Sequence, residues 1–148
     1  MERDRLPKRV VVGAVALFVL LQMIPYGRDH QNPPVVAEPH WDSPATRELV
    51  KRGCFDCHSH ETRWPWYSKI APSSWLVYYD VVTARGRLNF SDWQDGILPG
   101  ENPKLIQRLV TNGAMPPFRY RILHPEARLS SREKESLIEG VRQTMGGG

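Results

Sequence analysis

The feature that most constrains this chain is a five-residue segment containing both of its cysteines, Cys54-Phe55-Asp56-Cys57-His58. Side chains three and four residues apart share one face of a helical turn, so both thiols and the imidazole can face one flat ligand. C-x-x-C-H is the attachment signature of c-type haem. In such sites each thiol forms a thioether with a vinyl group and the histidine binds the iron. The segment therefore predicts covalent haem with His58 as one axial ligand.

Three other chemistries use the same residue types. A thioredoxin-like C-x-x-C pair needs a βαβ context, and no such pattern is visible around residues 51–64. A zinc site could use Cys54, Cys57, His58 and His60, but a second ligand pair at typical spacing is missing. A disulfide between cysteines three residues apart on a helix is geometrically awkward and closes only a short loop. Haem attachment is favoured, and a thiol oxidoreductase remains an alternative.

The chain has 148 residues, of which 41% are hydrophobic and 24% are charged, enough for one compact domain with a short appendage. Its pI of about 9.3 invites a nucleic-acid interpretation. From Glu38 to the end, however, 15 Lys and Arg stand against 13 Asp and Glu, a net charge of +2. Two ionised haem propionates would roughly cancel this charge, so we expect no nucleic-acid partner.

The N-terminal residues have the pattern of an export signal or a membrane anchor. A basic segment precedes an almost unbroken apolar run over residues 10–24, and Pro25-Tyr26-Gly27 matches a cleavage site poorly. Residues 1–27 are therefore predicted to be an uncleaved, single-pass transmembrane anchor in the cytoplasmic membrane. The positive-inside rule leaves the chain from Gly27 onward on the periplasmic side, where covalent haem is normally attached.

Beyond the anchor, residues 28–40 contain Pro33, Pro34 and Pro39 and predict an extended linker. Residues 41–145 are expected to form an all-α, cytochrome c-like haem domain, because no strand pattern competes. The expected helices run from Ser43, an N-cap, to Gly53; from Pro72 to about Gly86; from Asn102 to Gly113; and from Ser130, which forms a capping box with Glu133. The helix from Pro72 has an apolar stripe that is predicted to face a core; the stripe comprises Trp75, Leu76, Tyr79 and Val82.

The opposite face of the haem needs its own ligand, and Met115 is the best candidate. It lies in Gly113-Ala114-Met115-Pro116-Pro117, where two prolines stiffen the backbone after a helix. His124, on a nearby loop, is the alternative, and bis-histidine ligation would lower the reduction potential relative to His/Met. The second ring nitrogen of His58 is expected to donate to a backbone carbonyl, with the segment from Pro72 as the candidate acceptor region.

Further blocks accompany these motifs at residues 65–72 and 88–93, at Tyr120 and at Leu123-His124-Pro125. With these blocks, the chain resembles c-type cytochromes, and more narrowly the haem-binding domain family of small exported bacterial proteins, over about residues 41–144. The resemblance implies a cytochrome c-like fold and haem binding, and members are often found alongside cytochrome c and di-haem peroxidase modules. His60 departs from the asparagine expected there, which makes it a candidate extra ligand or pH-sensitive contact. The resemblance rests on residues 54–59, 65–72, 88–93 and 115–117, with Tyr120 and Leu123-His124-Pro125.

Together these features predict a membrane-anchored mono-haem electron carrier rather than an enzyme. Cys54 and Cys57 are expected to anchor haem c, while His58 and Met115 bind its iron and leave no open position for a substrate. The expected partners are redox proteins such as cytochromes, oxidases or peroxidases. The main alternative is a haem sensor or peroxidase-associated module in which Met115 is displaced.

Overall fold

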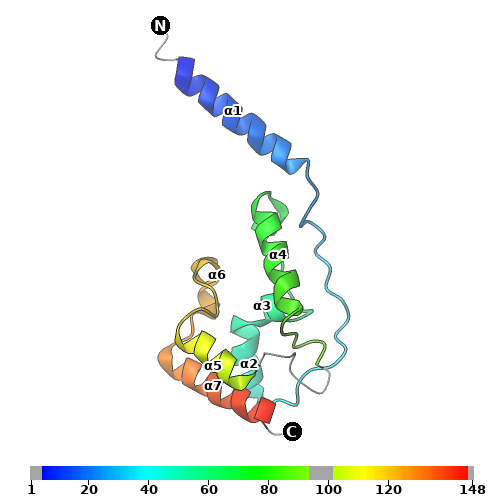
Figure 1. Cartoon of the computed structure of the whole chain (residues 1–148), viewed down its shortest axis with the longest axis vertical. Helices are drawn as coiled ribbons and strands as arrows, with labels where there is room; N and C mark the ends of the chain where they lie inside the picture. Colours follow the sequence, from blue (N-terminus) through cyan, green and yellow to red (C-terminus); the bar gives the residue numbers. More distant parts are fainter. Residues whose placement is uncertain (1–4, 94–101, 147–148) are drawn as a thin grey trace. The chain divides into compact units, whose positions relative to one another are not determined.

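The computed structural model describes residues 5–93 and 102–146, and all regular elements in these residues are helices (Figure 1). The prediction of an all-α fold is confirmed. An isolated parallel bridge pairs Ala37 with Asp92. The elements are α1 (Arg5–Gln22), α2 (Pro44–Gly53), α3 (Phe55–His58), the 3-10 helix η1 (Trp66–Lys69), α4 (Ser73–Arg85), α5 (Pro103–Thr111), α6 (Phe118–Leu123), the 3-10 helix η2 (Pro125–Ala127) and α7 (Ser131–Gly146).

The described chain divides into two compact units. The first unit comprises Met1–Gln31 and Trp64–Asp80, and the second comprises Asn32–Arg63 and Val81–Gly148. The C-x-x-C-H segment and Met115 both belong to the second unit, which we call the site unit. Residues 64–80 belong to the other unit although they are central in the sequence, because their partners lie in the N-terminal segment.

The site unit is built on the packing of α7 against α2 and α5. A Cβ at Gly140 of α7 would collide with the side chain of Thr46 of α2, so a glycine permits the close approach of the two helices. Phe55, directly inside the C-x-x-C-H segment, is part of the core. The buried core residues are Val50, Phe55, Leu88, Phe90, Val110, Leu129, Leu137 and Val141.

The capping residues in the sequence correctly predicted where three helices begin. The Ser43 side chain accepts a hydrogen bond from the Thr46 N–H, and the Asn102 side chain accepts one from the Leu105 N–H. Ser130 and Glu133 form the predicted capping box, since each side chain accepts from the other's backbone N–H. These caps satisfy N–H groups that a helix leaves without an internal partner.

Residues 32–40 are extended, and they belong to the site unit, where hydrogen bonds join them to other segments. The Val36 N–H donates to Ser91 O at 2.8 Å, and the Trp93 N–H donates to Ala37 O at 3.1 Å. The Glu38 carboxylate accepts two hydrogen bonds from the Arg47 guanidinium. The sequence did not predict this backbone pairing, because the segment has no apolar periodicity.

In the other unit, the end of α1 is attached to residues 64–80. The Gln22 side chain donates to Ala71 O and accepts from the Ala71 N–H, both at 2.9 Å. Gly27 has φ +74° and lies against Ser74 O, where a side chain would collide. Residues 1–4 of the predicted anchor lie outside the described residues. Within the described ones, no helix combines the length and the apolar character needed to cross a bilayer.

The prediction for the buried face of α4 is wrong. Leu76, Tyr79 and Val82 are 47%, 60% and 49% exposed, whereas Ser74 and Val81 are buried. Positions 74 and 81 share one helix face, which is offset by one residue from the predicted stripe. Apolar residues occur on both faces of α4, so periodicity identified the helix but not the face that is buried.

Candidate functional site

The C-x-x-C-H segment forms the predicted helical turn at the junction of two helices. Cys54 follows the last residue of α2 and has φ −127° and ψ −34°, which breaks the helix and starts α3. Its N–H donates to Val50 O at 2.8 Å, and its carbonyl accepts from the N–H groups of Cys57 and His58 at 3.1 and 2.8 Å. This turn keeps the two thiols and the imidazole together.

His58 is fixed by the segment that follows α4. Its Nδ1 lies 3.0 Å from Leu88 O, and its own carbonyl accepts from the Phe90 N–H at 2.8 Å. A carbonyl only accepts, so Nδ1 carries a proton, and Nε2 is the ring nitrogen that could bind a metal. The expected backbone carbonyl is therefore present, but its assignment to the region of Pro72 is wrong. The chain returns to His58 after α4 and not before it.

Cys54 and Cys57 are present as thiols and are partly buried. Burial, and to a smaller extent the neighbouring Cys57, raises the pKa of Cys54 to about 12. The thiolate is the nucleophile in thiol–disulfide exchange, and at neutral pH this group is protonated. The environment of Cys54 thus argues against the thiol oxidoreductase alternative.

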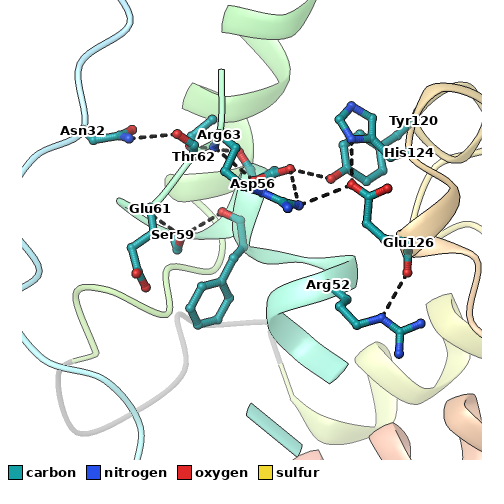
Figure 2. Close-up of polar contacts among 11 residues, drawn as sticks. Asn32, Arg52, Asp56, Ser59, Glu61, Thr62, Arg63, Tyr120, His124 and Glu126 are labelled. Atoms are coloured by element: carbon teal, nitrogen blue, oxygen red, sulfur yellow. Dashed lines mark hydrogen bonds and ion pairs between the residues drawn. The ribbon is translucent and has the colours of Figure 1, made fainter. Parts of the chain in front are cut away.

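Asp56, between the two cysteines, is a buried carboxylate with a full set of donors (Figure 2). Its Oδ1 accepts from the backbone N–H and Nε of Arg63, and its Oδ2 accepts from Arg63 Nη2 and from the Tyr120 hydroxyl at 2.6 Å. A buried charge is costly unless it is paired and hydrogen-bonded. These bonds satisfy Asp56 and attach α6 to the C-x-x-C-H segment.

The same network extends to His124, the alternative distal ligand. Glu126 Oε1 lies 3.4 Å from Arg63 Nη2 and 3.2 Å from His124 Nδ1. The His124 ring stacks on Tyr120 with centroids 4.1 Å apart. The bond with Asp56 raises the pKa of Arg63. Burial, together with the bond to Asp56, raises the pKa of Tyr120 and keeps its hydroxyl protonated. These contacts connect His124 with the network, and the bond to Glu126 uses its Nδ1.

Met115 lies on a loop packed beside the residue that precedes Cys54. Gly113 has φ +73°, a conformation that favours glycine, and the Met115 N–H donates to Leu109 O at 2.9 Å. The following residue, Pro116, is buried, and its Cγ would lie 3.3 Å from a Cβ placed on Gly53. The structure thus brings the Met115 loop and the C-x-x-C-H segment together.

His60 is engaged at both ring nitrogens. Its Nδ1 donates to Pro34 O at 2.8 Å, and its Nε2 accepts from Asn89 Nδ2 at 2.9 Å. These bonds use the proton and the lone pair of the neutral ring, so they argue against His60 as an extra ligand and against the zinc alternative. His60 instead connects residue 34 with the segment after α4.

Arg85 places a cation near the C-x-x-C-H segment. Its Nε donates to Ser59 O at 2.7 Å, and its Nη2 donates to the side chains of Asn32 and Thr62. Burial lowers the pKa of Arg85, and the charge of Cys57 acts in the opposite direction. A guanidinium in this position could pair with a carboxylate of a bound cofactor.

Sequence reasoning identified the motif residues and Met115 but missed the roles of Asp56, Arg63, Arg85 and Leu88. Asp56 occupies a variable position of the motif. Arg63, Arg85 and Leu88 lie outside the motif and contact it or the residue next to it only in the folded chain. Their one sequence signal is the nearness of Asp56 to the cysteines. Tyr120 entered only as part of the family pattern.

The residues present fit haem. Two thiols and an imidazole whose Nε2 could bind a metal lie in one turn, and a cationic side chain lies beside them. The nearby helix α6 presents apolar side chains to the surface, as is common at ligand and partner sites. This donor set on an all-helical scaffold defines a small helical haem protein.

The comparison with protein families agrees with this class. The model of the haem-binding domain family matches residues 16–143, which is most of the chain. The chain belongs to the haem-binding domain family. Neither a curated protein nor a solved structure matches it.

Proposed function

We propose that this protein is a c-type mono-haem electron carrier. The observation that carries the proposal is the turn of residues 54–58, in which Cys54 and Cys57 lie beside His58 and the bond to Leu88 O fixes the His58 tautomer. Cys54 and Cys57 would form the thioethers, and Nε2 of His58 would bind the iron. A carbonyl acceptor on Nδ1 orients the ring and increases its basicity as a ligand.

Met115 is proposed as the second axial ligand. Its loop packs against Gly53, the residue before Cys54, through Pro116, and this contact is the reason for preferring Met115 to His124. Haem with His/Met ligation supplies one-electron transfer at a raised potential. With His58 and Met115 both bound to it, the haem would have no position for a substrate, and it would act as a carrier rather than an enzyme.

The proposal places the protein at the cytoplasmic membrane, with the site unit on the periplasmic side. Large apolar side chains of α1 are exposed, among them Val12, Leu17 and Phe18, and a basic segment precedes them. Deletion of residues 1–27 should move the haem protein from the membrane to the soluble fraction. Retention in the membrane would contradict this role of α1. The proposed partners are redox proteins, and the small net charge of the rest of the chain does not favour nucleic acid.

The function is tested with the full-length protein made in a host that attaches haem c. The wild type should show a methionine-to-iron charge-transfer band and slow binding of carbon monoxide when reduced. Met115→Ala should remove the band and open the site to carbon monoxide, while His124→Ala should keep the band. Met23→Ala, at an exposed methionine, is the matched control and should behave as the wild type.

Two results would contradict the proposal. Rapid binding of carbon monoxide by the wild type would favour a sensor or peroxidase-associated module. An unchanged band in Met115→Ala would exclude Met115 as the ligand.

A further inference from the structure

The short helix α6 connects the two segments that are proposed to bind the iron from opposite sides. The Tyr120 hydroxyl donates to Asp56 Oδ2 at 2.6 Å, inside the C-x-x-C-H segment (Figure 2). The next residue, Arg121, donates from Nη2 to Gly113 O at 3.4 Å, two residues before Met115. The helix also begins only three residues after Met115. The position of α6 therefore sets the position of the Met115 loop.

Few apolar contacts hold α6 in place. None of its residues is buried, and Phe118, Ile122 and Leu123 are 71%, 53% and 58% exposed. Arg128 donates to the carbonyls of Arg121 and Ile122, but these bonds join α6 to its own continuation. Segments with few buried contacts open at low cost, so the polar bond of Tyr120 provides a large part of the attachment.

The acceptor makes this bond a strong one. Asp56 is 7% exposed and is paired with Arg63, and a hydrogen bond from a neutral hydroxyl to a carboxylate is shorter and stronger than one between neutral groups. The 2.6 Å separation has the length of such a bond. The ring of Tyr120 also supports His124 by stacking, and Tyr120→Phe would preserve this contact while removing the hydroxyl.

We propose that Tyr120 is a positioning residue that holds Met115 on the haem iron through its hydrogen bond to Asp56. The inference rests on the proposed function, because it assumes Met115 as the axial ligand. It goes further by naming what determines the strength of that ligation. Cys54, Cys57 and His58 are held by the backbone of the turn and by Leu88, so their attachment does not depend on Tyr120.

The test is Tyr120→Phe in the full-length, haem-loaded protein. Loss of a hydrogen bond to a charged group corresponds to roughly ten- to a hundredfold in an equilibrium. Carbon monoxide should therefore bind to the reduced variant at least about tenfold faster than to the wild type. The methionine-to-iron band should weaken, while haem remains on the chain after denaturation. Tyr79→Phe makes the same chemical change at an exposed tyrosine of α4 and should match the wild type.

A second variant tests whether the acceptor of this bond is Asp56. Asp56→Asn removes the charge and replaces one accepting oxygen by an NH2 donor, so its effect on the band and on carbon monoxide binding should have the same direction. In the double variant, the two effects should be less than additive, because both weaken the bond between Tyr120 and Asp56, while Asp56→Asn also changes the bonds from Arg63. Wild-type carbon monoxide kinetics and band in Tyr120→Phe would overturn the inference. Full additivity would overturn it as well.

The failure of the proposed function would be visible separately. A wild-type protein that lacks the methionine-to-iron band contradicts Met115 ligation, and with it the inference, whatever Tyr120 does. A wild type with the band and a Tyr120→Phe variant indistinguishable from it contradicts only the inference.

Discussion

The two segments that meet at the site are held in different ways. The C-x-x-C-H turn is held by backbone hydrogen bonds, by the Leu88 carbonyl and by Phe55 in the core. The segment from Met115 through α6 contributes no buried helix residue and depends on Pro116, Tyr120 and Arg121. Under the proposed ligation, this difference predicts a rigid His58 side and a Met115 side whose hold on the iron can be tuned by single side chains.

The largest effect on stability is expected from Phe55→Ala. Phe55 is fully buried and packs against Phe90 and Trp41, so its loss should lower the free energy of unfolding by about 3–5 kcal/mol. Phe118→Ala in α6 is the matched control and should change it by less than about 0.5 kcal/mol, since this side chain is exposed. Denaturant unfolding of both variants measures the contrast. Equal losses would contradict the difference between the two segments.

Arg63→Leu addresses the network that joins the segments. The variant leaves the buried Asp56 carboxylate without its guanidinium partner. Because Arg63 is itself largely exposed, we expect a loss of about 1–2 kcal/mol in the free energy of unfolding, below the usual cost of breaking a fully buried pair. Lys69→Leu, in the other unit and outside this network, provides the comparison. A loss no larger than that of Lys69→Leu would show that Arg63 does not stabilise Asp56.

Gly53→Ala should separate stability from ligation. A Cβ at this position would press on Pro116 at 3.3 Å, while alanine gains roughly 0.5–1 kcal/mol of helix propensity. The free energy of unfolding should therefore change little, but the methionine-to-iron band should weaken because the Met115 loop shifts. Gly146→Ala, where the added Cβ meets nothing within 4 Å, should leave the band unchanged. An unchanged band in Gly53→Ala would show that Pro116 does not position Met115.

The smallest expected effect is on the pH dependence of stability, through Glu133 near the start of α7. The N–H of Ser130, then Arg52 and the Ser130 hydroxyl, lower the pKa of Glu133 to about 2 from an ordinary value of 4.5. Its contribution to stability is therefore present above pH 4.5 and is lost as the pH falls toward 2. Glu133→Gln should show a smaller decrease in the free energy of unfolding over that range than the wild type. Glu135→Gln, on the exposed face of α7, should retain the wild-type dependence of stability on pH. The same dependence in Glu133→Gln and the wild type would show that Glu133 does not contribute.

Features that depend on neighbouring residues were predictable. Ser43, Asn102 and Ser130 cap helices because capping involves residues only a few positions apart, and the C-x-x-C-H turn follows from helical spacing. The family pattern also indicated haem, in agreement with the family match.

Features set by distant contacts were not predictable. The pairing of His58 with Leu88 and that of Asp56 with Tyr120 join residues 30 and 64 positions apart. The grouping of residues 64–80 with the N-terminal segment likewise includes the bonds between Gln22 and Ala71. Local periodicity contains no information on such pairings, and for the same reason it failed to choose the buried face of α4.

The most direct test of the central claim is the intact mass of the denatured chain after expression in a host that attaches haem c. Covalent attachment through Cys54 and Cys57 predicts a mass increased by one haem in the wild type and no increase in the Cys54→Ala/Cys57→Ala variant. A wild-type chain that releases its haem on denaturation would contradict the account.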